Sequence, residues 1–178
     1  IVAVTDWKGG VYNDKGLDIP ALIDYVKQHR TVAGFSGADK LDPAKLFGLD
    51  VDVLVPAALE NQITMENAPS IKAKIIAEGA NGPTDVDGDA ILIERDIALL
   101  PDILCNAGGV IVSYFEWLQN KRSEFWDLEE VDRKLHRRML SAYERVRDTA
   151  RDRGVDWRTA AYVVALQRLE TVYKERGT

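Results

Sequence analysis

Short apolar runs that end at proline or glycine recur through the first hundred residues, and they constrain the fold more than any other feature. The runs cover residues 51–56, 74–79 and 98–101. A β-ladder cannot continue through proline and is weakened at glycine, so each run is interpreted as one short strand. Between the last two runs, residues 85–96 carry apolar side chains at helical spacing. Strands that alternate with helices at such distances predict βαβ units and a parallel sheet.

The amino-terminal residues extend this pattern. Residues 1–5 are rich in β-branched side chains, which predicts a strand that is buried on both faces of a parallel sheet. Turns are expected at residues 9–10 and 13–16, and Asp18 is expected to cap the helix that follows. Because the chain starts with Ile1 directly inside a strand, we expect that a further part of the protein precedes it.

The last third of the sequence is predicted to be helical. A glycine-rich stretch at residues 106–109 leads into an apolar helix at 110–118. Asp127 is expected to cap a long helix that ends at Gly154, and Asp156 is expected to cap the final helix.

The apolar spacing in the final helix predicts which of its faces packs inward. That face holds Ala161, Ala165, Leu169 and Val172. Taken together, the patterns predict an α/β protein with two parts. A partial dinucleotide-binding domain is expected over residues 1–120, and a helical tail that packs on it is expected over residues 121–178.

Charge and cysteine content restrict the classes of partner. The chain has 23 Lys and Arg against 29 Asp and Glu, a net charge of −6. This balance argues against nucleic acid, because phosphate contacts need a concentrated cationic face; the basic run at 133–138 is flanked by acids and is interpreted as a solvated helix face. The single cysteine, Cys105, fits a reducing compartment such as the cytoplasm, and no Cys/His cluster predicts a metal. No apolar run approaches the ~20 residues of a membrane-spanning helix.

Polar and small residues stand where the predicted strands end, and ligands bind beyond those ends in open α/β sheets. Asp6 follows the first strand. An acid at that place in a dinucleotide-binding unit accepts hydrogen bonds from the adenosine ribose, and elsewhere it caps a turn. Small residues at 56–58 would let a cofactor approach the backbone closely. Asn81 is suited either to capping its own turn or to bonding a ligand ribose.

Asn106 precedes the two glycines at the start of the predicted 110–118 helix. Its amide offers both a donor and an acceptor, which suits a carboxamide partner such as nicotinamide. Ser113 lies seven residues further along, nearly two helical turns, so it can face the same side as Asn106. The same residues also suit a glycine-rich helix that packs closely on the sheet, in which Ser113 bonds its own backbone.

Six blocks, in order along essentially the whole chain, resemble glutamate dehydrogenase, a member of the Glu/Leu/Phe/Val dehydrogenase family. They are residues 3–6 with 9–13, then 55–60, 78–84, 101–103, 106–110 and 158–162. The resemblance is to the carboxyl-terminal part of that enzyme, without the first strand and glycine-rich loop of its coenzyme domain. It implies a Rossmann-like, mostly parallel sheet with helices on both faces and a helical carboxyl-terminal tail.

The resemblance also implies roles for single residues. Those expected to approach the coenzyme are Asp6, Ala57, Asn81 and Asn106. Those expected to line the substrate pocket are Val110 and Ser113, with the Ser113 hydroxyl bonded to a glutamate carboxylate. The family's catalytic lysines and aspartate lie in its amino-terminal domain, so no catalytic residue is expected here. Residues 1–178 alone are therefore expected to be inactive.

The reaction implied by the resemblance is oxidative deamination of L-glutamate to 2-oxoglutarate and ammonia, with NAD or NADP as the coenzyme and a homo-hexamer as the complete protein. Asp6 favours NAD because it would repel a 2′-phosphate, although the neighbouring Lys8 can offset this repulsion. Two alternatives stay open. One is a branched-chain or aromatic amino acid dehydrogenase, against which the polar Ser113 argues. The other is a non-catalytic regulatory subunit of a glutamate dehydrogenase assembly.

Overall fold

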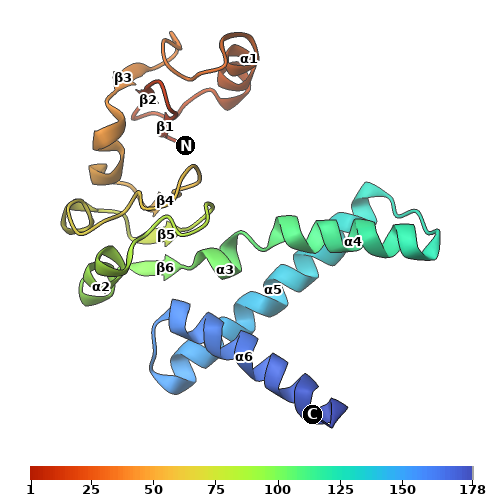
Figure 1. Cartoon of the computed structure of the whole chain (residues 1–178). Helices are drawn as coiled ribbons and strands as arrows, with labels where there is room; N and C mark the ends of the chain where they lie inside the picture. Colours follow the sequence, from red (N-terminus) through yellow and green to blue (C-terminus); the bar gives the residue numbers. More distant parts are fainter. Residues whose placement is uncertain (178) are drawn as a thin grey trace.

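The computed structural model describes residues 1–177 and shows two small sheets followed by a helical tail (Figure 1). The strands are β1 (Ala3–Thr5), β2 (Gly10–Tyr12), β3 (Asp39–Leu41), β4 (Val53–Leu54), β5 (Ile75–Ala77) and β6 (Ala98–Leu100). The helices are α1 (Ile19–His29), η1 (Pro43–Gly48), η2 (Ala68–Ser70), α2 (Val86–Glu94), α3 (Asp102–Cys105), α4 (Gly108–Arg122), α5 (Leu128–Arg153) and α6 (Trp157–Arg176), where η marks a 3₁₀ helix.

The first sheet, sheet A, corrects the prediction for residues 1–5. It contains β1, β2 and β3 in that order, and both pairs are antiparallel. The chain reverses between Asp6 and Gly9, where the Asp6 N–H donates to the Gly9 carbonyl over 2.8 Å. β2 therefore returns directly beside β1, and β1 is only partly buried. Of the two residues expected in a turn here, Gly9 closes the reversal, but Gly10 already begins β2.

The second sheet, sheet B, confirms the predicted parallel sheet. It contains β4, β5 and β6 in that order, all parallel. Ile76 is fully buried in its main apolar cluster, together with Leu92 of α2. Alternate side chains along each strand point to the opposite face of sheet B. On that face, Val53 is 51% exposed and Ile75 is 38% exposed. Because the strands are parallel, their carboxyl ends all lie at one edge of the sheet, where the candidate site is found.

The caps predicted from the sequence begin the long helices of the tail. The Asp127 carboxylate accepts a hydrogen bond from the Glu130 N–H over 2.7 Å, and that of Asp156 accepts one from the Thr159 N–H over 2.8 Å. α5 ends at Gly154, as predicted. Figure 1 shows α5 running from the far end of α4 back toward the sheets, where α6 folds against it. α4, for which a helix at residues 110–118 was predicted, runs from Gly108 to Arg122 and so continues through residue 120.

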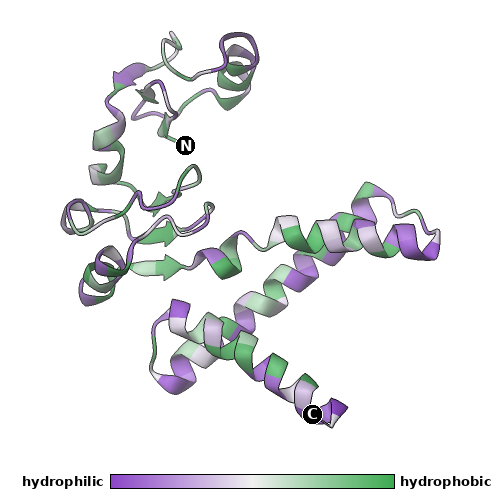
Figure 2. Cartoon of the chain, in the orientation of Figure 1, coloured by the Kyte–Doolittle hydropathy of each residue, from purple (hydrophilic) through white to green (hydrophobic). Residues whose placement is uncertain are grey.

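The inward face predicted for α6 is correct only over its first turns. Those turns belong to a buried cluster that joins α3, α5 and α6: Leu104, Val146, Ala150, Ala160 and Ala161. Ala165, Leu169 and Val172 are exposed, against the prediction, because the second half of α6 extends beyond its contact with α5 (Figure 1). Figure 2 shows that hydrophobic residues continue along this projecting half of α6. None of the helices within residues 1–177 is long and apolar enough to cross a membrane.

Candidate functional site

An open hollow of about 530 Å³ lies at the carboxyl edge of sheet B. Its walls come from the segment after β4, from the loop after β5 and from the amino-terminal turns of α4. The lining residues are Ala58, Gly79, Ala80, Asn81, Asn106, Gly109, Val110 and Ser113. Small side chains and glycines leave backbone accessible, and the polar groups are amides and one hydroxyl, so the hollow can bind a polar ligand without carrying a charge of its own.

Two asparagine amides form the polar centre of the hollow. Asn106 Nδ2 donates to Asn81 Oδ1 over 2.7 Å and to the Ala80 carbonyl over 3.3 Å. A primary amide has two N–H donors, so Asn106 can offer a ligand its carbonyl oxygen. Asn81, whose oxygen already accepts, can offer its two N–H groups. The pair therefore presents one acceptor and one donor group side by side.

The loop after β5 depends on two glycines for its shape. A Cβ at Gly79 would lie 3.1 Å from the Ala57 Cβ, so the glycine permits the loop after β5 to approach the segment after β4 closely. Gly82 has a φ of +53°, a left-handed conformation that side chains disfavour. These two positions bring Asn81 to the edge of the hollow.

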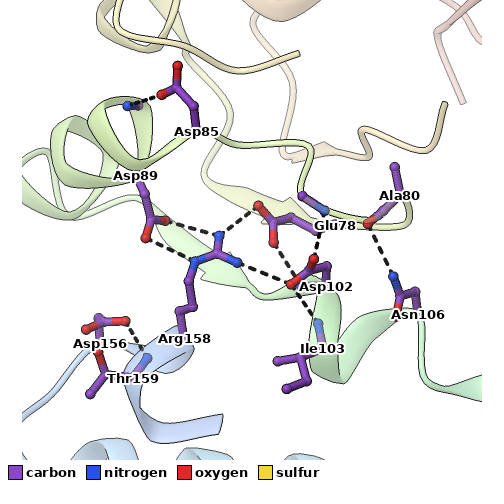
Figure 3. A network of polar contacts seen from close by, with 12 residues as sticks. Glu78, Ala80, Asp85, Asp89, Asp102, Ile103, Asn106, Asp156, Arg158 and Thr159 are labelled. Carbon is purple, nitrogen blue, oxygen red and sulfur yellow. Dashed lines mark hydrogen bonds and ion pairs between the residues drawn. The ribbon is translucent and has the colours of Figure 1, made fainter. Parts of the chain in front are cut away.

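Beneath the hollow, Arg158 of α6 joins three carboxylates from three different elements (Figure 3). Its guanidinium donates to Glu78 after β5 over 2.9 Å, to Asp89 of α2 over 3.0 Å and to Asp102 of α3 over 3.3 Å. Glu78 is fully buried. Burial by itself lowers the pKa of Arg158, but the hydrogen bonds and charges of Glu78 and Asp89 outweigh that effect and raise the pKa. The cluster ties the tail to the sheet.

The same carboxylates also organise the residues around the hollow. α3 begins after Pro101 without a side-chain cap from that residue, and the Glu78 carboxylate instead accepts the Asp102 N–H over 2.8 Å. A negative group at a helix amino terminus is favourable because it meets unpaired N–H groups. The other carboxylate oxygen of Asp102 accepts the Gly82 N–H over 2.8 Å. Asp102 thus links Arg158 to the loop that carries Asn81.

The structure brings four of the six predicted site residues together. Asn81, Asn106, Val110 and Ser113 all line the hollow, so Ser113 does face the same side as Asn106. Ala57 stands just outside, against Gly79, and its neighbour Ala58 lines the hollow instead. The binding roles of these residues stay predictions.

Asp6 does not line the hollow and lies in the turn between β1 and β2. Its carboxylate accepts hydrogen bonds from the N–H groups of Lys8 (2.9 Å), Gly9 (3.1 Å) and Val32 (2.7 Å) and from the hydroxyl of Thr31 (3.1 Å). Burial by itself would raise the pKa of Asp6, but these hydrogen bonds, led by that from Lys8, outweigh it and lower the pKa. Asp6 is therefore ionised at neutral pH.

Reasoning from the sequence missed the charged cluster around Arg158. Both Arg158 and Glu78 lie in blocks that carry the family resemblance, yet neither was assigned a role. The one local signal is that Glu78 directly follows an apolar strand, where an unpaired carboxylate would be costly. No spacing rule connects it to a cation 80 residues away.

Cys105 lines a second, mostly apolar hollow of about 270 Å³ between α3 and α5. Its thiol is partly buried, and burial together with the nearby charge of Glu78 raises its pKa. A raised pKa disfavours the reactive thiolate. Within residues 1–177, no group of three or more His, Cys, Asp and Glu side chains is arranged to hold a metal ion.

A parallel sheet with small-residue loops and paired amides at its carboxyl edge places the protein in the open α/β class, whose ligands bind beyond the strand ends. Comparison with known families agrees and goes further. Residues 1–177 match the model of the Glutamate/Leucine/Phenylalanine/Valine dehydrogenase family. The chain belongs to this family.

Three relatives show the extent of the match. The glutamate dehydrogenase of Thermotoga maritima is 49% identical over 99% of this chain and 42% of its own length. The NADP-specific glutamate dehydrogenase of a Synechocystis species is 46% identical over 100% of this chain and 44% of its own length. A cryptic catabolic NAD-specific glutamate dehydrogenase of Bacillus subtilis is 45% identical over 99% of this chain and 41% of its own length. The chain thus spans less than half of these relatives.

Solved structures of two glutamate dehydrogenases match the fold of nearly all of this chain. Glutamate dehydrogenase from Peptoniphilus asaccharolyticus matches with a TM-score of 0.82 and 37% identity, over 99% of this chain and 41% of that one. The hetero-hexameric glutamate dehydrogenase from Thermus thermophilus, in a leucine-bound form, matches with a TM-score of 0.90 and 31% identity, over 99% and 42% of the two chains.

Proposed function

We propose that the protein catalyses oxidative deamination of L-glutamate to 2-oxoglutarate and ammonia with a nicotinamide coenzyme, and that residues 1–178 supply part of the coenzyme and substrate cleft. The observation that carries the proposal is the hollow at the edge of sheet B, in which Asn81, Asn106 and Ser113 converge in a chain of this family. The complete protein is proposed to assemble as a homo-hexamer.

The two amides suit the coenzyme. The free carbonyl oxygen of Asn106 accepts a hydrogen bond from the carboxamide NH₂ of the nicotinamide. The NH₂ of Asn81 donates to a ribose hydroxyl, and the small side chains of Ala57 and Ala58 let the dinucleotide lie against the backbone. Bound in this way, the nicotinamide supplies the hydride-accepting carbon of the reaction.

Ser113 and Val110 suit the substrate. Both lie on α4 at the same hollow, Ser113 with a hydroxyl that can donate to the side-chain carboxylate of glutamate and Val110 with an apolar wall. A hydroxyl here disfavours leucine or phenylalanine, whose side chains need an apolar surface. This is what favours glutamate over the other substrates in the family name.

Within residues 1–177, none of the side chains that line the hollow is an acid or a base. Moving protons to and from the amino group requires a general acid or base within hydrogen-bond reach of the substrate. Those groups are proposed to come from a part of the protein outside residues 1–178, and residues 1–178 alone are proposed to turn over no glutamate.

NAD is proposed as the preferred form of the coenzyme. The Asp6 carboxylate stays charged at neutral pH and its four hydrogen bonds fix it in place. A fixed negative charge near the adenosine ribose would repel a 2′-phosphate more than a hydroxyl.

The test uses the full-length protein and follows amino-acid-dependent reduction of NAD⁺ and NADP⁺. Glutamate is expected to be oxidised in preference to leucine and phenylalanine. Ser113→Ala is expected to raise the KM for glutamate by roughly tenfold, equal to one lost hydrogen bond to a charged group, with the KM for coenzyme unchanged. Ser141→Ala, an exposed serine on α5, is the matched control and is expected to change neither value. Faster oxidation of leucine or phenylalanine than of glutamate would contradict the proposal.

A further inference from the structure

We propose that Asp102, held in place by Arg158, is a positioning residue that sets the coenzyme-facing amides of Asn81 and Asn106. The inference rests on the proposed function of the hollow and assigns part of its geometry to the charged cluster beneath it. Asp102 does not line the hollow and acts only through the residues that do.

The first step is the fixation of Asp102 itself. Arg158 Nη1 donates to Asp102 Oδ1 over 3.3 Å, and the buried Glu78 accepts the Asp102 backbone N–H over 2.8 Å. Glu78 is in turn bound to Arg158 over 2.9 Å. The side chain and the backbone of Asp102 are therefore both held from the same guanidinium, one directly and one through Glu78 (Figure 3).

The second step leads from Asp102 to the loop after β5. Asp102 Oδ2 accepts the Gly82 N–H over 2.8 Å, so the carboxylate bridges Arg158 and the loop. Gly82 has a positive φ, so this bond lies at the residue where the loop adopts a left-handed backbone conformation. Asn81, the adjacent residue, is held at the hollow by that turn.

The third step closes the path on Asn106. Its Nδ2 binds the Ala80 carbonyl and Asn81 Oδ1, both in the same loop. Asn106 also caps the carboxyl end of α3, the helix that Asp102 begins. Asp102 therefore helps to position both asparagines, Asn81 through the loop after β5 and Asn106 through α3.

Asp89 shows what a purely stabilising contact looks like in the same cluster. It binds Arg158 over 3.0 and 3.2 Å and is as buried as Asp102, with side-chain exposures of 18% and 23%. Asp89 lies on α2, and within residues 1–177 its side chain makes no hydrogen bond or ion pair to the loop or to α3. Removing either carboxylate costs Arg158 one partner, but only Asp102 connects to the hollow.

The experiment compares Asp102→Asn with Asp89→Asn in the full-length enzyme. Both are expected to lower the Tm, because each removes one charged partner of Arg158. Only Asp102→Asn is expected to raise the KM for coenzyme and lower kcat, together by roughly 10- to 100-fold in kcat/KM, since misplacement by about 1 Å can cost that much. Asp89→Asn is expected to stay within about twofold of the wild type.

A double-mutant cycle keeps the test decisive if Asp102→Asn is poorly stable. Asn106→Ala is expected to be strongly non-additive with Asp102→Asn in kcat/KM, and additive with Asp89→Asn. If the wild type oxidises glutamate normally and Asp102→Asn behaves as Asp89→Asn does, the inference is wrong. If the wild type reduces neither coenzyme with any amino acid, the proposed function itself is wrong.

Discussion

Asp6 and Glu78 each follow a strand directly, and the two acids are used in different ways. Asp6 follows β1, and its carboxylate is bound by groups no further along the chain than Val32. Glu78 follows β5, is fully buried and pairs with Arg158, 80 residues away. A partly exposed acid can be satisfied by neutral donors, here the N–H groups of its own turn together with groups of Thr31 and Val32. A buried one needs a cation, because an unpaired charge in the interior is very costly.

The comparison also separates the two sheets. In sheet A, β1 and β2 are joined by a tight reversal of the chain, and the acid of this sheet serves that reversal. Sheet B is built from segments joined by crossovers, and its acid fastens the helical tail to the strands. The candidate site lies beside the acid with the distant partner. The predictions below test how far this division holds.

The largest effect is expected from removing Arg158. Arg158→Met would leave the fully buried Glu78 without its cation, which is expected to destabilise the full-length protein by about 3–5 kcal/mol. Denaturant or thermal unfolding measures the loss. Glu78→Gln combined with Arg158→Met is expected to recover much of it, since the fully buried charge is then removed together with its cation. A double variant that is less stable than Arg158→Met would show that the buried charge is not the cause.

A smaller effect is expected at Asp6. Asp6→Ser is expected to cost about 1 kcal/mol, because the turn loses hydrogen bonds to a charged acceptor in a partly exposed place. The lowered pKa fixes the sign of the pH dependence. The stabilisation by Asp6 is fully present above its ordinary pKa of 3.8 and is lost as the pH falls through the lower value of the folded state. Asp6→Ser should therefore flatten the acid limb of a plot of Tm against pH.

The same variant tests the coenzyme role of Asp6. The ratio of kcat/KM for NAD over NADP is expected to fall roughly fivefold, the equivalent of about 1 kcal/mol of charge repulsion. An unchanged ratio would confine Asp6 to the β1–β2 turn and would remove the support for NAD.

The smallest effect is expected at Cys105, whose thiol pKa is raised by burial and by the charge of Glu78. Its raised pKa predicts alkylation at pH 8 to 9 that is slower than for the same thiol in the denatured chain. Glu78→Gln is expected to speed the reaction, because the carboxylate contributes to the shift, but not to the denatured rate, because burial contributes more. A Cys105 as reactive as a free thiol would contradict this, and a Glu78→Gln variant with an unaltered rate would limit the cause to burial.

Much of the fold could be predicted because its signals are local. Asp18, Asp127 and Asp156 each cap a helix from the position that the sequence indicates. The three strands of sheet B follow from apolar runs closed by Pro or Gly. The pairing of β1 was predicted wrongly, because β-branched composition marks a strand but does not choose its partner. The outer half of α6 was also predicted wrongly, because an apolar stripe does not show whether this chain supplies the surface that covers it.

The candidate site divides in the same way. Asn81, Asn106 and Ser113 were candidates from the sequence, because each stands beside a turn or at a helical spacing that can be read locally, and the structure places all three at the hollow. The sequence by itself determined the strand ends, the helix caps and the kinds of polar group at the edge of sheet B. Only the tertiary structure decided that Arg158 joins Glu78, Asp89 and Asp102, and that Asp102 reaches Gly82. A turn or a cap is a contact between near neighbours, whereas an ion pair across 80 residues exists only once the packing of the tail on the sheet has placed its partners together.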